Sequence, residues 1–555
     1  MQRNLTAFSE SEFDLVIVGG GITGACLAWD AVNRGYTVAL VEKGDFGAST
    51  SSASSKLLHG GIRYLQQGRF DKVRESAMER VYYQTLAPHL CQYVPFAVPT
   101  YPGLSKGKWL LRFAMWLYQL ICAGQNRHIR DSSKKVPGWK MLSKSQFAAS
   151  IPEFNFHRIT GAALFYESHM QSSERMTLAF IESSILKGAK VANYVNVDGF
   201  LLKNGKVCGV TATDLMENKP LQIKAACVIN AAGPWIPLLN KSISTRSIVT
   251  AFSKGAHIVT SPVTKNVAVA LPTQKQNQAI VNRGGRHVFI IPWRGCSLIG
   301  TTYDSYHGEL DKVRPDEHDI EELISDINSA FGNEVLTRRD VKYSFAGIYP
   351  LIDDKINTKV YQGTGEYQIV DHQLIDGIEG LVTVFGAKFT TARLLAEKAL
   401  DEIGVKFNKP LHACRTKTTA LACGDIDDIS AFRQRKKAEY KAYLSEQTID
   451  HLVTYYGNNI DKLITYVKDD PQWASPLATG YPDIAAQIVF AAEQELTCHL
   501  DDILFRRTGL GTLGNPGTDV IDQCAAIVSE VFAWDDSTRQ AEIDRVLAYY
   551  DYSNS

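Results

Sequence analysis

The chain has 555 residues, of which 45% are hydrophobic, and its 59 basic residues are matched by 59 acidic ones. A chain of this length predicts two or three domains with enough core to bury a large cofactor. The balance of charge argues against nucleic acid as a partner, because no bulk positive surface would hold a polyanion.

The ten cysteines stand singly along the chain, from Cys26 to Cys524, and no two form a CxxC pair. We therefore expect neither a metal site nor a disulfide framework, and a reducing compartment fits best. Residues 1–14 are polar and lack the apolar core of a secretory signal. These features favour a cytoplasmic protein, and a peripheral position on the inner face of the cytoplasmic membrane stays open.

The N-terminal segment follows the pattern of a dinucleotide-binding fold. Residues 13–19 (FDLVIVG) form a short apolar run that is typical of a buried parallel strand. Gly19, Gly21 and Gly24 then supply GxGxxG at the start of a helix that runs through Arg34. The glycines serve a tight turn, a close approach of backbone to pyrophosphate, and the packing of helix on strand.

A second strand, at residues 37–41, ends in Glu42, at the distance where an acid can bond ribose hydroxyls. The phosphates would lie on the helix N-terminus. A chance cluster of glycines is the alternative, but strand, turn, helix, strand and acid follow one another in the expected order. We therefore expect Ile22, Thr23, Glu42 and Lys43 to contact the cofactor together with the glycines.

The most apolar stretch, residues 109–122 (WLLRFAMWLYQLIC), contains an arginine and is too short to cross a bilayer. Helices that are apolar on nearly all sides are usually buried, so we expect a core or interface helix. Two tryptophans and the flanking Lys106, Lys108 and Arg112 keep a helix on a membrane surface as the alternative.

Residues 45–65 (DFGASTSSASSKLLHGGIRYL) are crowded with hydroxyl residues and glycines, which offer hydrogen-bond donors to an extended cofactor. Within it, residues 51–65 (SSASSKLLHGGIRYL) resemble the signature of the FAD-dependent glycerol-3-phosphate dehydrogenases, a branch of the D-amino-acid-oxidase-like flavoproteins. Further matching segments follow in order, at residues 87–90 (APHL), 228–235 (VINAAGPW), 254–259 (KGAHIV), 291–302 (IPWRGCSLIGTT), 384–393 (VFGAKFTTAR) and 506–508 (RRT).

The resemblance implies FAD as the cofactor and an extended set of residues around it. The set adds Thr50, Ser51, Ser52, Ser55, Lys56, Leu57, His59, Gly60, Gly61, Ala232, Gly233, Gly386, Lys388, Phe389 and Thr390. His59, beside the paired glycines, is expected to bond backbone groups rather than to act as a base. In such flavoproteins a helix that here begins at Thr390 points its N-terminus at the flavin, and its dipole favours the negative charge of the reduced ring.

Residues 245–344 predict a strand-rich roof over the flavin, with residues 287–292 and 297–302 as hairpin partners. The resemblance places a histidine here, at His257, that takes the hydroxyl proton of the substrate. Histidine suits this role because its ordinary pKa lies near working pH. A hydrogen-bonded structural histidine is the alternative.

The resemblance also implies that Arg63 and Tyr64 lie beside the substrate, and that Lys388 lies close to both flavin and substrate. A flavin-binding protein without turnover would have no chemical need for this group of residues together with His257. Their joint presence therefore favours an enzyme.

Two positions depart from the family pattern. Family members carry an arginine in GxRPL, where this chain has Tyr349, and another before an Asp-Tyr pair, where this chain has Gly365 and Glu366. By resemblance those arginines grip the substrate phosphate, which a guanidinium fork matches well. We therefore hypothesise an unphosphorylated polyol, a hydroxy acid, or a phosphate ester held by other bases such as Arg63.

From about residue 404 the sequence changes to helical periods with dense charge, which predicts a C-terminal helical cap domain at 406–555. Its charge run at 433–437 predicts a solvated helix face, with anionic lipid or partner binding as the alternative. Residues 1–405 predict an α/β FAD-dependent oxidoreductase region. Rossmann-like FAD-binding segments are expected at 12–90, 160–245 and 345–405, and strand-rich substrate-domain segments at 91–159 and 246–344.

Together these features predict a FAD-dependent dehydrogenase of glycerol metabolism. The resemblance implies oxidation of glycerol 3-phosphate to dihydroxyacetone phosphate by hydride transfer to flavin N5, with electrons passed to quinone by a homodimer. The alternative is a related oxidoreductase that acts on an unphosphorylated polyol, a hydroxy acid or an amine, with oxygen or a soluble carrier as acceptor.

Overall fold

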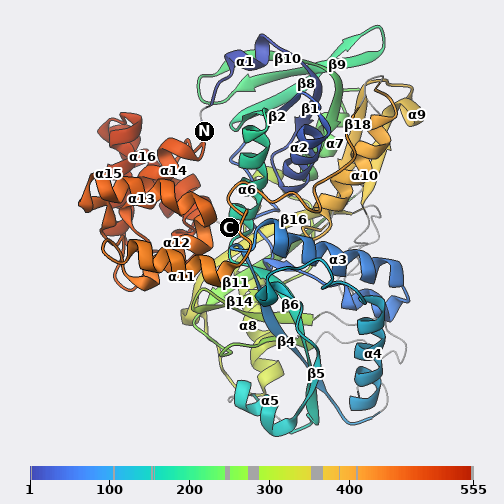
Figure 1. Ribbon diagram of the computed structural model, residues 1–555, viewed down its shortest axis with the longest axis vertical. Coiled ribbons are helices and arrows are strands. Elements are labelled where there is room, and N and C mark those ends of the chain that lie inside the picture. Colours follow the sequence, from blue (N-terminus) through green and yellow to red (C-terminus); the bar gives the residue numbers. More distant parts are fainter. Residues whose placement is uncertain are drawn as a thin grey trace.

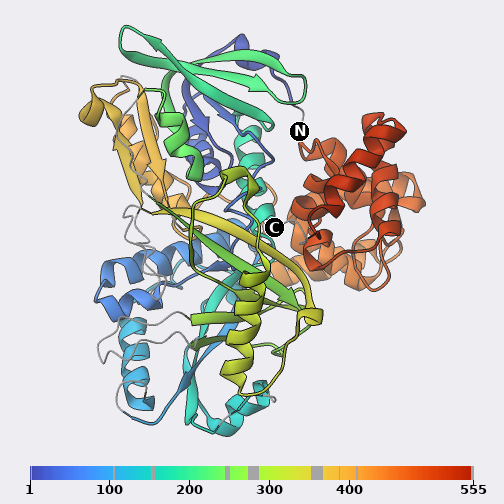
Figure 2. The ribbon, with the colours of Figure 1, turned by 180° about the vertical axis from the view of Figure 1, so that it is seen from behind.

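The computed structural model describes residues 1, 3–103, 107–151, 154–155, 157–243, 251–272, 287–351, 367–386, 388–407 and 411–551. Two β-sheets lie toward opposite ends of the long axis, and C-terminal helices pack beside the junction of the sheets (Figure 1). The view from behind shows that these C-terminal helices lie on one side of the two sheets (Figure 2). The predicted α/β class with a C-terminal helical domain is confirmed.

The first sheet carries the dinucleotide-binding fold. Its eight strands are β1 (Glu12–Val18), β2 (Val38–Val41), β7 (Lys190–Ala192), β8 (Val195–Lys203), β9 (Lys206–Asp214), β10 (Lys219–Asn230), β17 (Gln368–Asp371) and β18 (Leu381–Phe385). The order β18, β10, β1, β2, β7 is parallel throughout. The carboxyl ends of these strands therefore meet at one edge, where such sheets bind ligands.

Both faces of the first sheet are covered, which explains why β2 and β18 are buried along their whole length. Helices α2 (Ile22–Arg34), α6 (Ser173–Leu186) and α10 (Ala392–Gly404) form a common apolar core on one face. The antiparallel strands β8 and β9 fold over the other face together with α1 (Thr6–Ser9) and α7 (Ile236–Asn240).

The second sheet is the strand-rich roof expected from the middle of the sequence. Its ten strands are β3 (Leu57–Leu58), β4 (Cys91–Thr100), β5 (Lys140–Ser143), β6 (Gly161–Met170), β11 (Ala251–Thr260), β12 (Ala268–Pro272), β13 (His287–Trp293), β14 (Cys296–Gly300), β15 (Asp304–Tyr306) and β16 (Val341–Leu351). β13 and β14 form the predicted hairpin. β6 pairs with β4 along its length, so it joins this sheet although the sequence boundaries group it with FAD-binding segments.

Helices complete the shell of the second sheet. α5 (Lys144–Ser150) and α8 (Glu317–Phe331) share an apolar core with it. α3 (Phe70–Leu86) lies between the two sheets, and α9 (His372–Asp376) lies beside β17 and β18 (Figure 1). None of the described helices is both long and apolar enough to span a membrane.

Helix α4 (Lys108–Ile121) is not a core helix, which was one of the two expectations, and an interface helix stays a prediction. Trp109, Phe113 and Trp116 are 78%, 58% and 53% exposed, and only Met115 and Tyr118 are buried. The helix packs one narrow face against the molecule and leaves the rest of its apolar surface uncovered. Apolar content alone could not reveal this, because it does not say which faces find partners.

The C-terminal region is helical and has an apolar core of its own. A second apolar core joins it to the second sheet. Its helices are α11 (Ile429–Tyr440), α12 (Glu446–Tyr456), α13 (Ile460–Asp469), α14 (Ala485–Gln494), α15 (Thr518–Phe532) and α16 (Asp536–Leu547). The core of the region itself is formed by α11, α12, α13 and one side of α14, whereas α15, α16 and the other side of α14 belong to the cluster shared with the second sheet. Leu504 and Phe505 pack in one cluster with Val259 and Leu298 of the second sheet. The two regions therefore share a continuous apolar interior.

The charge run at 433–437 is only partly the solvated face that was expected. Lys436 is 5% exposed, and its Nζ donates to Glu439 Oε2 at 3.0 Å and also to Asp461. Lys437 pairs with Asp450. The expectation was wrong for Lys436, because Asp461, which accepts from its ammonium, lies on α13 and cannot be inferred from the local sequence of α11.

Candidate active site

A cavity of about 1290 Å³ begins at the carboxyl ends of β1 and β2 and runs under the second sheet. Most of the residues predicted from the sequence line it. They are Gly19, Gly21, Ile22, Thr23, Glu42, Lys43, Thr50, Ser51, Ser52, Ser55, Lys56, Leu57, His59, Gly61, Arg63, Tyr64, Ala232, Gly233, His257, Tyr349, Gly386, Lys388, Phe389 and Thr390. Residues that are far apart in the chain are thus gathered around one space.

Two of the predicted glycines lie behind the cavity wall instead. A Cβ on Gly24 would stand 1.8 Å from the carbonyl oxygen of Gly19, so Gly24 permits the packing of α2 on the turn. A Cβ on Gly60 would meet the Tyr118 hydroxyl at 2.1 Å. Gly365 lies outside the described residues.

The turn between β1 and α2 leaves room for a cofactor and none for side chains. Gly19 has φ +106°, and a Cβ there would meet the Ala231 carbonyl oxygen at 2.6 Å. Ile22 begins α2, and its N–H donates to Ser51 Oγ at 2.9 Å. The glycine turn is therefore bound to the serine-rich segment that follows β2.

The carboxylate of Glu42 is built into this turn. It accepts the N–H of Gly20 at 2.6 Å and the N–H of Gly44 at 2.8 Å. Burial raises its pKa, and the two backbone donors act in the opposite direction. Next to it, Lys43 Nζ lies 4.3 Å from the centre of the Trp235 ring, at the same end of the cavity.

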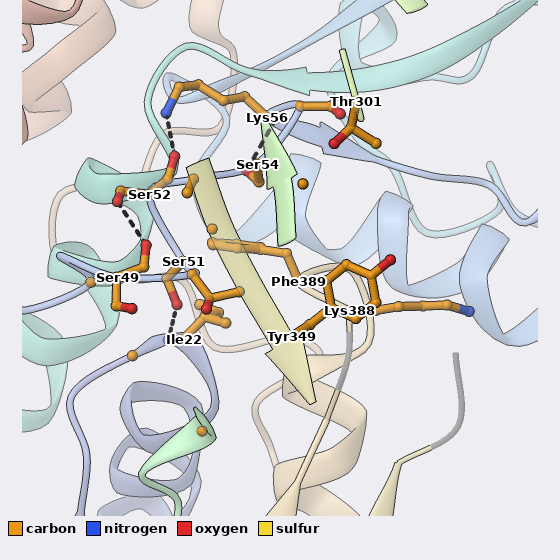
Figure 3. Close-up of a pocket in the computed structure, with 18 of the residues that line it drawn as sticks. Ile22, Ser49, Ser51, Ser52, Ser54, Lys56, Thr301, Tyr349, Lys388 and Phe389 are labelled. Atoms are coloured by element: carbon orange, nitrogen blue, oxygen red, sulfur yellow. Dashed lines mark hydrogen bonds between the residues drawn. The ribbon is translucent and has the colours of Figure 1, made fainter. Parts of the chain in front are cut away.

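The segment 44–56, which we call the serine loop, contributes six hydroxyl-bearing residues to the cavity wall, which are Ser49, Thr50, Ser51, Ser52, Ser54 and Ser55 (Figure 3). The Thr50 hydroxyl donates to the Ile348 carbonyl of β16. At its end, Lys56 is buried, and its Nζ donates to Glu174 Oε1 at 2.7 Å and to Ser173 Oγ at 3.2 Å. The ammonium of Lys56 thus anchors the loop to the start of α6.

Ser172 and Ser173, at the start of α6, belong to the same set of contacts. Ser172 Oγ caps α6 by accepting the Arg175 N–H at 3.0 Å, and it donates to Glu174 Oε2 at 2.9 Å. Ser173 donates to the same carboxylate oxygen at 3.2 Å. The acid that balances Lys56 is therefore Glu174, which was not singled out from the sequence.

His257 lies on β11 with its ring against the serine loop. Its Nε2 is 2.9 Å from Ser55 Oγ, and its ring stacks on Phe345 with centroids 5.2 Å apart and planes 11° apart. The side chain is 4% exposed. Burial, assisted by the charge of Lys56, lowers the pKa of His257 to about 3, so the ring is neutral at physiological pH.

Lys388 approaches the cavity from the turn after β18. Its Nζ lies 3.8 Å from the centre of the Tyr64 ring, and burial lowers its pKa to about 7. Arg63 is exposed and lines the same cavity. Lys388 therefore titrates near neutral pH in this site and His257 does not, whereas the sequence had suggested His257 for that role.

Tyr349 and His257 lie on the same face of the second sheet. His257 is paired with Phe345 of β16, and Tyr349 stands four residues farther along that strand. At about 3.3 Å per residue, this places the two positions roughly 13 Å apart along the sheet. Tyr349, Lys388 and Phe389 all line the cavity and are labelled in Figure 3.

The turn that contains His59 is fixed by buried groups from α3, α4 and β6. Glu167 accepts the Gly60 N–H at 2.6 Å and an Arg80 N–H at 3.0 Å, while the Tyr118 hydroxyl donates to the Gly60 carbonyl at 2.9 Å. The His59 N–H donates to Thr390 Oγ1 at 3.0 Å. Burial lowers the pKa of the His59 ring.

Comparison with known proteins agrees with this geometry. Residues 14–401 match the family described as FAD dependent oxidoreductase, and residues 414–539 match the C-terminal domain of alpha-glycerophosphate oxidase. The chain therefore belongs to the FAD-dependent oxidoreductase family. Within that family it is a member of the glycerol-3-phosphate dehydrogenase branch, and the resemblance first seen in the sequence is confirmed.

The relatives extend over most of the chain. Glycerol-3-phosphate dehydrogenase from Synechocystis sp. is 31% identical over 99% of this chain and 98% of its own length. Aerobic glycerol-3-phosphate dehydrogenase from Staphylococcus aureus strain MRSA252 is 31% identical over 90% of this chain and 87% of its own.

Solved structures share the fold. Glycerol-3-phosphate dehydrogenase from Bacillus halodurans, complexed with FAD, aligns with TM-score 0.77 and 24% identity, covering 98% of this chain and 96% of its own. L-proline dehydrogenase from P. horikoshii aligns with TM-score 0.53 and 17% identity, covering 72% of this chain and 95% of its own.

The cofactor of the protein is FAD, and the described residues fit it. The glycine turn has no space for a side chain at Gly19, and the cavity is continuous from that turn to His257 and Lys388. Sequence reasoning missed several other residues that line this cavity, namely Asp45, Glu174, Trp235, Phe289, Tyr343 and Arg506. Trp235 and Arg506 lie in segments that carried the resemblance, so a signal for them existed.

Proposed function

We propose that the protein oxidises glycerol 3-phosphate to dihydroxyacetone phosphate and passes the electrons to a quinone. The observation that carries this proposal is the convergence of His257, Arg63, Tyr64 and Lys388 on the cavity that begins at the glycine turn. When bound, FAD supplies the acceptor for the hydride. The activity named for the 31% identical relatives supports the choice of substrate.

In this proposal His257 receives the hydroxyl proton of the substrate at Nε2. The ring is neutral before substrate enters, and in the tautomer that carries its proton on Nδ1 the Nε2 atom, 2.9 Å from Ser55 Oγ, accepts a proton. A phosphate dianion in the cavity would raise the pKa of the ring, because a nearby negative charge favours imidazolium. Stacking on Phe345 fixes the plane of the ring.

Lys388 and Arg63 hold the anionic end of the substrate. A protonated Lys388 supplies a charge that burial makes unfavourable when the cavity contains no anion, and the phosphate would offset that cost. Lys388 packs over Tyr64, which limits the positions its ammonium can reach. Binding the anion in this way keeps the hydroxyl-bearing carbon near His257.

A second substrate class is favoured by Tyr349. This residue lines the cavity where family members have a phosphate-binding arginine, and a phenol cannot replace a guanidinium fork. An unphosphorylated polyol, hydroxy acid or amine, with oxygen or a soluble carrier as electron acceptor, is therefore the alternative.

Anaerobic bleaching of the flavin separates these proposals. Purified holoenzyme is mixed with glycerol 3-phosphate, glycerol, other polyols, hydroxy acids or amines, and the absorbance of oxidised flavin is followed. Saturable bleaching by glycerol 3-phosphate alone supports the first proposal and contradicts the second. Bleaching by an unphosphorylated compound alone has the opposite meaning, and bleaching by none of them contradicts both.

We also propose that α4 binds the membrane in which a quinone acceptor is dissolved. Trp109, Phe113 and Trp116 form an exposed apolar face, and Lys108 and Arg112 supply positive charge for anionic lipid. The opposite side of the same helix lines the cavity through its residues Leu111, Ala114 and Met115. A homodimer stays a prediction, and light scattering of the purified protein would test it.

A further inference from the structure

A buried cluster of charges joins the C-terminal region to the serine loop. Asp45 is fully buried at the start of the loop. Arg507 forks onto it, with its two terminal nitrogens 2.7 Å and 2.8 Å from the carboxylate oxygens. Arg506 Nε donates to the same carboxylate at 2.6 Å. One acid of the cofactor region thus holds two arginines of the C-terminal region.

The arginines are themselves fixed within the C-terminal region. Arg506 also donates to Asp501 at 3.0 Å and to Asp502, while Arg507 donates to the Glu495 carbonyl at 3.0 Å. They lie in a π-helical turn, in which the Thr508 N–H reaches the Ile503 carbonyl at 2.9 Å. Local helix geometry therefore departs from α-helix at the point of contact with Asp45.

The loop that Asp45 begins is the part of the chain that lies along the cavity. The Gly47 N–H donates to the Gly20 carbonyl at 3.1 Å, and Ser51 accepts the N–H of Ile22. The far end of the loop is held by the buried pair of Lys56 with Glu174. Asp45 and Arg506 both line the cavity. Arg507 consequently reaches the cofactor site through the Asp45 carboxylate, while Arg506 both bonds that carboxylate and lines the cavity itself.

We propose that Arg506 and Arg507 are positioning residues for FAD: through Asp45 they hold the serine loop against the cofactor, so that docking of the C-terminal helices and retention of FAD are coupled. The inference rests on the FAD dependence of the family and is independent of the substrate. Coupling of this kind is reciprocal, so a change at the arginines must appear both in FAD binding and in the mobility of the loop.

The test variant is Asp45→Asn, which keeps the size of the side chain and removes its charge. The matched control is Glu495→Gln, because Glu495 forms a buried fork with Arg175 between the same two regions, at 2.6 Å and 2.8 Å, but does not touch the serine loop. Arg507→Lys is a second test variant, which keeps the charge and loses the fork.

The first measurement is release of FAD from purified holoenzyme after dilution, followed by flavin fluorescence. We expect Asp45→Asn to accelerate release about 5- to 150-fold, with a smaller acceleration in Arg507→Lys. Glu495→Gln should stay within about twofold of the unmodified protein, since the substitution changes only the side chain, which bonds Arg175, and leaves the backbone carbonyl that accepts from Arg507 in place. Release within twofold of the unmodified protein for both Asp45→Asn and Arg507→Lys overturns the proposal, and so does equal acceleration by Glu495→Gln.

The second measurement is hydrogen exchange of the holoenzymes. We expect Asp45→Asn to increase exchange in residues 44–56 as well as in residues 501–513, and Glu495→Gln to increase it in the C-terminal helices alone. A purely structural contact would leave the serine loop protected in Asp45→Asn, and that result contradicts the coupling. Neither measurement depends on turnover, so failure of the proposed substrate would leave it intact.

Discussion

His257 is nearly fully enclosed, yet its Nε2 faces the hydroxyl of Ser55 at the cavity. We predict that His257→Ala lowers kcat about 10²- to 10⁴-fold with glycerol 3-phosphate, the usual range for loss of a general base. FAD content, read from the flavin spectrum, should remain full. Ser55→Ala, which removes the hydroxyl next to Nε2, should lower kcat less than His257→Ala does. A kcat for His257→Ala within threefold of the unmodified enzyme would show that another group accepts the proton.

The lowered pKa of Lys388 predicts how kcat/KM depends on pH. Burial lowers its pKa to about 7, so its ammonium is present below pH 7 and is lost as the pH rises. We predict that kcat/KM for glycerol 3-phosphate falls between about pH 6 and pH 8.5, because the phosphate loses its counter-charge. Lys388→Arg should shift this fall to much higher pH, since a guanidinium stays protonated. A kcat/KM that rises across this interval would instead assign Lys388 the role of a base.

Tyr349 tests the missing arginine directly. We predict that Tyr349→Arg lowers KM for glycerol 3-phosphate about tenfold or more, because a charged hydrogen bond contributes about 1.5–3 kcal/mol. The KM for glycerol, which has no phosphate, should hardly change. Tyr349→Phe serves as the control for loss of the hydroxyl. Equal changes for both substrates would show that position 349 does not reach a phosphate.

At the scale of elements, the sequence could not predict which faces of helix α4 are buried and which are exposed. We predict that the double variant Trp109→Ser, Trp116→Ser binds vesicles with phosphatidylglycerol about tenfold or more weakly, because each buried aromatic contributes about 1.5–3 kcal/mol. The matched control is Leu374→Ser on α9, where an apolar side chain is 83% exposed. Co-sedimentation measures both, and equal loss in the control would remove α4 from membrane binding.

Elements that depend on local pattern could be predicted, and those that depend on distant partners could not. The strand before Gly19 and the hairpin of β13 and β14 follow from periodicity and turn residues. The burial of Lys436 depends on Asp461, which belongs to another helix. For the same reason, only resemblance could bring His257 and Lys388 to one site.

At the scale of the whole molecule, the C-terminal region shares an apolar cluster with the second sheet through Leu504 and Phe505. We predict that a chain ending at Phe407 does not accumulate in soluble form, because it would expose the sheet side of this cluster. Calorimetry of the full holoenzyme should show one unfolding transition. Two well-separated transitions, or a soluble folded truncation, would show that the regions are independent.

The ion cluster at Asp45 marks the limit of inference from sequence alone. Asp45 and Arg507 are 462 positions apart, and neither carries a local pattern that names the other. The match at 506–508 signalled that the segment matters, but only the packing of the C-terminal region explains the contact. Because buried charges require partners, the sequence predicts that such pairs exist. It does not predict which residues form them.

Helix α4 is at once an outer surface and a wall. Leu111 and Met115 line the cavity, while Trp109 and Trp116 are exposed on the other side of the same helix. Both sides belong to one helix, so they move together. Any shift of α4 on binding lipid would therefore also move the cavity wall, and we would then expect the rate of catalysis to change in the presence of a membrane.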